Sequence, residues 1–130
     1  MTSYGEAAVT AVRLYTSGRA ESLKDAWSRA ADQIFGAGTS GAQKGCPQNA
    51  FLGLCEEGLV KGVPGGQYTR SKKNKAYALE AVAILRQNPE LGANPNVLWD
   101  VVMGNEQKRH NSQMHVVVAL WNEGLLVHRA

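Results

Sequence analysis

The sequence predicts an all-α domain of six helices, built as two similar three-helix halves that share one core. Three observations predict this fold. Apolar residues recur at helical spacing along six stretches, and residues typical of helix ends bracket them. The heptapeptide LCEEGLV of residues 54–60 returns as LWNEGLL at residues 120–126, 66 positions later. With 130 residues and 44% apolar content, the chain suffices for one packed domain over residues 1–130.

The first two helices are predicted from apolar stripes with helical periodicity. Ser3 and Glu6 have the spacing of a capping box at the start of the first helix, and Gly18 lies at its end. Ser22 and Gly36 mark the ends of the second helix. The stripes consist of Tyr4, Ala8, Ala11, Val12 and Tyr15 in the first helix and Leu23, Ala26, Trp27, Ala30 and Ile34 in the second.

The third helix follows a glycine-rich connector at residues 36–45. Cys46 at the cap position and Pro47 at the first helical position predict its start, and Gly58 predicts its end as a left-handed residue. A proline and two glycines then interrupt the pattern in residues 61–70. This segment fits a small β-hairpin or, equally, an irregular linker.

Three more helices are predicted in the second half. The fourth runs from about Lys72 to Gln87, and the short fifth begins at Asn94 and stops at Gly104. The sixth contains three consecutive valines, so a strand competes with it. A helix is favoured because Ser112 can cap its start and apolar residues keep the helical interval, namely Met114, Val117, Val118 and Trp121.

The repeated heptapeptide suggests an internal repeat of about residues 3–62 and 71–128. In each half, two helices are followed by a loop and then by a third helix that ends in a glycine cap. A unit of about 60 residues buries too little surface to be very stable alone, so two copies are expected to pack together. The alternative is coincidence, because Glu-Gly-Leu is a common way to end a helix.

Positive charge is concentrated in one stretch of a chain whose formal net charge is +3. Five cations follow the third helix without an intervening acid, which predicts an anion-facing surface. A merely solvated basic loop is the alternative. The five are Lys61, Arg70, Lys72, Lys73 and Lys75.

The segment AFLGLCEEGLVKGVPGGQYTRS, residues 50–71, resembles the recognition helix and wing of winged-helix DNA-binding domains. The resemblance covers roughly Trp27 to Arg70. It implies a helix whose first residues read base edges in the major groove, with Tyr68 on the wing and the five cations on phosphates. The residues that the resemblance places at the start of this helix, facing the base edges, are Gln43, Lys44, Gln48 and Asn49. The whole sequence also looks like a family of small bacterial proteins of uncharacterised function, which implies no activity.

Cations also precede two helices in matching positions. Lys44 lies before the third helix, and the run Gln107-Lys108-Arg109-His110 lies before the sixth. A helix start carries partial positive charge and free N–H groups, so adjacent cations favour phosphate binding there. Ordinary surface lysines are the alternative.

A catalytic role would depend on Cys46, because a thiol at a helix start near Lys44 can gain nucleophilicity. His110 or His115 would have to serve as its base. The alternative is that Cys46 only caps its helix. The histidines lack the spacing of a metal pair and no paired carboxylates are evident, so we expect no metal, cofactor or catalytic residue.

The partner expected from these patterns is a nucleic acid or another phosphate-bearing ligand. The alternative is a protein partner, with the chain serving as an adaptor module. No window has the apolar length of a membrane span, and the first residues lack the pattern of a secretion signal. Cys46 and Cys55 have no CxxC spacing and are read as reduced thiols. These features predict a cytoplasmic protein.

Overall fold

The computed structural model describes residues 2–106 and 108–127, and this part of the chain is helical, as the sequence predicts. Among the described residues there is no strand and no helix both long and apolar enough to cross a membrane. The elements are α1 (Ser3–Thr16), α2 (Leu23–Phe35), α3 (Gly45–Glu56), α4 (Lys72–Gln87), the 3-10 helix η1 (Pro89–Ala93), α5 (Pro95–Met103) and α6 (Gln113–Asn122).

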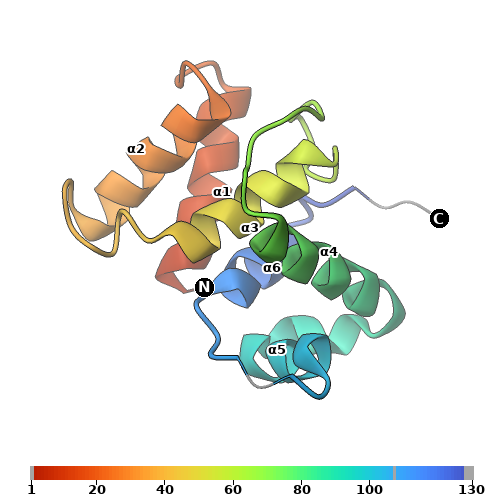
Figure 1. Cartoon of the computed structure of the whole chain (residues 1–130). Helices are drawn as coiled ribbons and strands as arrows, with labels where there is room; N and C mark the ends of the chain where they lie inside the picture. Colours follow the sequence, from red (N-terminus) through yellow and green to blue (C-terminus); the bar gives the residue numbers. More distant parts are fainter. Residues whose placement is uncertain (1, 107, 128–130) are drawn as a thin grey trace.

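Helices α3, α4 and α6 form the centre of the molecule (Figure 1). The pair α1 and α2 covers one side, through contacts of α1 with α6, and α5 covers another through α4 and α6. The core is continuous across these elements. Trp27 of α2 packs on Phe51 of α3, with ring centroids 5.3 Å apart, and both side chains are buried. Burial of each such large apolar side chain stabilises the fold by about 1.5–3 kcal/mol.

The two repeated heptapeptides end in the same turn. Gly58 and Gly124 have φ angles of 72° and 69°, a left-handed conformation that a residue with a Cβ rarely adopts. The chain segments after the two glycines then meet, and Val60 and Leu126 form an isolated antiparallel bridge. The N–H of Lys61 donates to Leu125 O at 2.8 Å, and the N–H of Val127 donates to Leu59 O at 2.7 Å. The end predicted for the third helix is therefore confirmed.

That the two complete halves of the chain are repeats of one another stays a prediction. Trp27 and Trp99, which the repeat aligns, have different neighbours. Trp99 packs on Tyr77 and His110, and its indole N–H donates to Lys108 O at 3.0 Å. The indole N–H of Trp27 has no hydrogen-bond partner within the described part of the chain. Residue 128, the predicted end of the repeat, lies outside the described residues.

Two predicted helix starts need correction. Thr2, not Ser3, caps α1, because its Oγ1 accepts the Gly5 N–H at 3.2 Å. In α3 the cap position belongs to Lys44 and the helix begins at Gly45, so Cys46 is not a cap. Both errors arise because several adjacent residues suit a helix start, and the backbone path selects one of them.

The start of α6 also differs from the prediction. Ser112 occupies the cap position with a left-handed φ of 69° and makes no capping hydrogen bond through its side chain. Instead, His110 Nε2 accepts the backbone N–H of Met114 at 3.0 Å. The helix predicted around the three valines is confirmed, since residues 116–118 lie within α6.

Residues 61–70 form an irregular loop, so the structure favours the linker over the hairpin. The pairing partner of Val60 is Leu126, not a residue of this loop. The loop folds back along α3: the Gly66 N–H donates to Glu56 O at 3.1 Å, and Thr69 Oγ1 donates to Asn49 Oδ1 at 2.8 Å.

Candidate functional site

The starts of α3, α4 and α6 meet on one face of the molecule (Figure 1). Lys44 Nζ donates to Ser112 Oγ at 3.5 Å, which joins α3 to α6. Gln113 Nε2 donates to Asn74 Oδ1 at 3.0 Å, which joins α6 to α4. We call this surface the helix-start face. It is formed by Lys44, Lys73, Asn74, Lys108 and residues 109–113, and Lys72 adjoins it as the first residue of α4, next to Arg70 and Lys75.

Two lysines on the helix-start face have their amino groups over aromatic rings. Lys44 Nζ lies 5.3 Å from the centroid of the Tyr4 ring. Lys108 Nζ lies 5.9 Å from the centroid of the Tyr77 ring and donates to Tyr77 Oη at 3.2 Å. These contacts favour a charged ammonium group without neutralising it. Neither aromatic contact places a negative charge beside these lysines.

Lys73 and Lys108 come from different segments of the chain, and each amino group acts on the pKa of the other. Lys108 lowers the pKa of Lys73, whereas Lys73 and Tyr77 raise that of Lys108, because the first proton on the pair is shared and the second is repelled. The carboxylate of Glu106 favours the charged form of both lysines. Within the described ranges, the ion pairs are Arg13–Glu123, Arg29–Asp25, Lys75–Glu56 and Lys75–Glu57. No lysine of the helix-start face belongs to one of them.

An open groove of about 1100 Å³ lies beside this face, between α2, α3 and the loop of residues 66–71. Four of the residues predicted for the site line it, namely Asn49, Tyr68, Arg70 and Lys75. The other lining residues are Lys24, Glu56, Glu57, Gly66, Gln67, Thr69 and Ser71. The fold thus collects here side chains that are up to 51 positions apart in the printed sequence.

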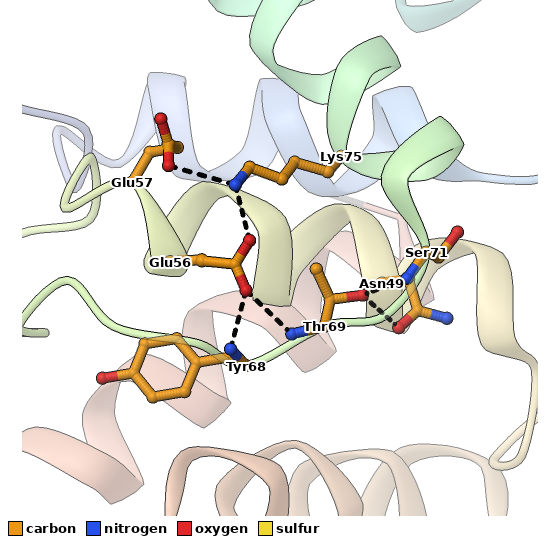
Figure 2. A network of polar contacts seen from close by, with 7 residues as sticks. All are labelled: Asn49, Glu56, Glu57, Tyr68, Thr69, Ser71 and Lys75. Atoms are coloured by element: carbon orange, nitrogen blue, oxygen red, sulfur yellow. Dashed lines mark hydrogen bonds and ion pairs between the residues drawn. The ribbon is translucent and has the colours of Figure 1, made fainter.

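One carboxylate organises the wall of the groove (Figure 2). Glu56 Oε1 accepts the backbone N–H groups of Tyr68 and Thr69, at 2.8 and 3.1 Å. Glu56 Oε2 accepts Lys75 Nζ at 2.5 Å, and the same ammonium group donates to Glu57 Oε2 at 3.0 Å. Glu56 therefore ties the loop and α4 to the end of α3.

Lys75 offsets part of the charge of the two carboxylates, and the three groups together keep a net charge of −1. Lys75, then the N–H groups of Thr69 and Tyr68, lower the pKa of Glu56 to about 2. Glu56 and Glu57 in turn raise the pKa of Lys75. The sequence contains no acidic residue between Lys61 and Lys75. The fold nevertheless places two carboxylates from the end of α3, Glu56 and Glu57, beside Lys75. Lys75 is consequently committed to an internal contact.

The ten predicted site residues do not form one cluster. Lys44 and Lys73 lie on the helix-start face, and Lys72 is the first residue of α4. Asn49, Tyr68, Arg70 and Lys75 line the groove. Gln43 is exposed in the turn before α3, and Gln48 is partly buried within α3. Lys61 lies apart, at the opposite end of α3, beside Leu125.

Lys108 is the residue that the predicted site lacked. The sequence did mark the run of residues 107–110 as a cationic helix start, but nothing in it indicated contact with Lys73. Only the packing of α4 against α5 and α6 brings the two lysines together. Gln107, part of the same run, lies outside the described residues.

Cys46 and the histidines do not form a hydrogen-bonded pair within the described part of the chain. The His110 ring lies between Trp99 and His115, at centroid distances of 5.1 and 5.0 Å. Burial, then the charges of His115 and Lys44, lower the pKa of His110 to about 4. Burial also raises the pKa of the Cys55 thiol. In residues 2–106 and 108–127, no three His, Cys, Asp or Glu side chains are grouped to hold a metal ion.

Comparisons with known proteins give one family. No curated protein and no solved structure matches the chain. The model of a family of unknown function, DUF6979, matches residues 1–127, and the chain therefore belongs to this family.

Proposed function

We propose that this protein binds a nucleic acid or another polyanion, without catalysis, through the helix-start face. The observation that carries the proposal is the meeting of three helix starts on one face, which the contacts Lys44–Ser112 and Gln113–Asn74 join. On this face the charges of Lys73 and Lys108 act on each other, and Glu106 acts on both without forming an ion pair among the described residues. Two ammonium groups about 4 Å apart in water repel each other by about 1 kcal/mol. An anion placed between them is attracted by both, so the arrangement favours a phosphate at this position.

The backbone adds to this attraction. The starts of α3, α4 and α6 each carry partial positive charge and N–H groups without a helical partner. Lys44 lies at the first of these starts and Lys72 and Lys73 at the second, and Lys108 reaches the same surface from the segment before the third. Such a surface suits a row of phosphates, as in a nucleic-acid backbone.

This interface differs from the one that the winged-helix resemblance implies. Residues 61–70 form an irregular loop in place of a wing, Lys61 lies at the far end of α3, and Lys75 is paired with Glu56 and Glu57. The proposed contacts come from lysines at three helix starts instead. Sequence-independent binding is expected, because these contacts address phosphates and not base edges.

The test is a series of binding measurements by fluorescence anisotropy with a labelled nucleic acid at increasing salt. We expect Lys73→Ala with Lys108→Ala to weaken binding about tenfold or more at low salt, and to reduce the slope of log affinity against log salt by about 2. The matched control is Arg19→Ala with Lys61→Ala. It removes the same charge from exposed positions at the other end of the molecule.

Two results would overturn the proposal. One is the absence of binding by the unaltered protein at low salt. The other is an equal loss in the two double variants, which would mean that only net charge matters. Circular dichroism of each variant shows whether the helices are retained, and this is expected because the altered side chains are exposed.

A further inference from the structure

We propose that the groove beside the helix-start face takes an unpaired stretch of nucleic acid, so that the preferred ligand is single-stranded. This inference rests on the proposed function and names its substrate class. The groove lies between α2, α3 and the loop of residues 66–71 and has a volume of about 1100 Å³.

The groove offers hydrogen-bond donors to a ligand, and three of the four oxygens of its two carboxylates already accept hydrogen bonds within the chain. Both carboxylate oxygens of Glu56 are engaged, by the N–H groups of Tyr68 and Thr69 and by Lys75. Glu57 is paired with the same lysine. Asn49 Oδ1 already accepts Thr69 Oγ1. Lys75 balances one of the two carboxylate charges, and with Lys24 and Arg70 the groove lining carries three cations and two carboxylates, a net charge of +1.

The donors that stay available are of the kind that binds phosphates and base carbonyls. Lys24 and Arg70 line the groove, are exposed, and take part in no ion pair within the described part of the chain. The side-chain nitrogen of Asn49 is likewise without a hydrogen-bond partner among the described residues. A ligand rich in acceptors, such as a polynucleotide, matches this set.

The groove is continuous with the helix-start face. Arg70 and Ser71 line one end of it, and Ser71 is the cap of α4, whose next residues are Lys72 and Lys73. A strand whose phosphates contact these lysines can therefore pass its neighbouring nucleotides along α3. A duplex keeps its bases paired and stacked, so it can use the lysines but cannot place bases in the groove.

Tyr68 supplies an aromatic surface for an unpaired base. Its hydroxyl donates to Pro64 O at 2.7 Å, and a Cβ at Gly66 would come within 3.2 Å of the tyrosine ring. The ring is therefore held in place over a glycine and lines the groove while partly exposed. Fixed aromatic rings beside cations are how proteins bind single strands without sequence preference.

The experiment compares short labelled oligomers of deoxythymidine and of uridine with a labelled duplex of the same length. We expect both single strands to bind more tightly than the duplex. Lys24→Ala with Arg70→Ala should weaken single-strand binding about tenfold and leave duplex binding unchanged. The control pair Arg19→Ala with Lys61→Ala, which removes the same charge, should change neither.

Equal losses for single strand and duplex, or no loss for either, would overturn this inference. Tyr68→Leu provides a second readout, because it removes the ring and keeps the charge, and it should weaken single-strand binding alone. Failure here is distinguishable from failure of the proposed function. In the first case the duplex still binds in a manner that depends on Lys73 and Lys108, and in the second neither ligand binds at low salt.

Discussion

At the scale of single residues, His110 connects stability to pH. Its Nε2 accepts the backbone N–H of Met114, a bond that only a neutral imidazole can make on that nitrogen. Lys44 and His115 face the ring and disfavour its charge, and Asp100 favours it. An imidazole that caps a helix from four residues upstream is not recognisable in the sequence, where Ser112 is the conventional choice.

The stability of the protein should fall as pH decreases from about 6.5 to about 4. The pKa of His110 is lowered from 6.5 to about 4, so in this range the unfolded chain binds a proton that the folded protein does not. The stabilisation is complete above the higher value and is lost as pH falls through the lower one. The difference between the two pKa values corresponds to about 3.4 kcal/mol, and solvent screening of this half-buried ring reduces the expected loss to about 2–3 kcal/mol. Urea unfolding across this range measures it.

The control variant is His110→Asn, which keeps a capping acceptor that does not titrate. We expect its unfolding free energy to be less sensitive to pH over the same range. His115 has a pKa lowered by burial and by Lys44, so a smaller dependence should persist in the variant. Identical pH dependence in the two proteins would contradict the assignment of the effect to His110.

At the scale of elements, α3 and α4 approach each other at a glycine. A Cβ at Gly53 would lie 2.7 Å from Lys75 Cβ and 2.8 Å from Lys75 Cα. This close approach also sets Lys75 over Glu56 and Glu57. Within a helical pattern, an internal glycine by itself indicates only a lower helix propensity, so this contact could not be predicted from the sequence.

Gly53→Ala should therefore destabilise the protein by about 1–3 kcal/mol, because the backbone of α4 must move to admit the methyl group. Gly45→Ala in the same helix is the matched control. A Cβ there meets only Asn49 Nδ2, at 3.6 Å, an ordinary contact. Thermal unfolding of the two variants should give a clear loss for the first and little change for the second. Equal melting temperatures would contradict the tight helix contact.

The helices themselves follow from local patterns. The bounds of α4 agree with the prediction, Lys72–Gln87, because its apolar stripe ends just before Pro89. The start of α5 agrees because Asn94 caps it, accepting the N–H groups of Asn96 and Val97. The starts of α1, α3 and α6 were less accurate, since those caps depend on where the preceding chain comes from.

At the scale of the whole molecule, the candidate site depends on contacts between distant segments. Charge patterning marked Lys44 as a cation at a helix start and Lys72 and Lys73 as part of a basic stretch, because both patterns are local. It could not show that Lys75 pairs with Glu56 and Glu57, or that Lys108 lies near Lys73. Tertiary packing decides which charges pair with one another, and local sequence patterns do not reveal it.

The central claim is that cations at three helix starts form one polyanion-binding face. Amide NMR spectra recorded during titration with a short oligonucleotide at low salt test it most directly. We expect the largest shift changes at residues 44–46, 72–74 and 108–113, and little change at residues 59–61 and 125–127, where the two repeated turns pair. Unchanged spectra, or the largest changes at the paired turns, would contradict the account.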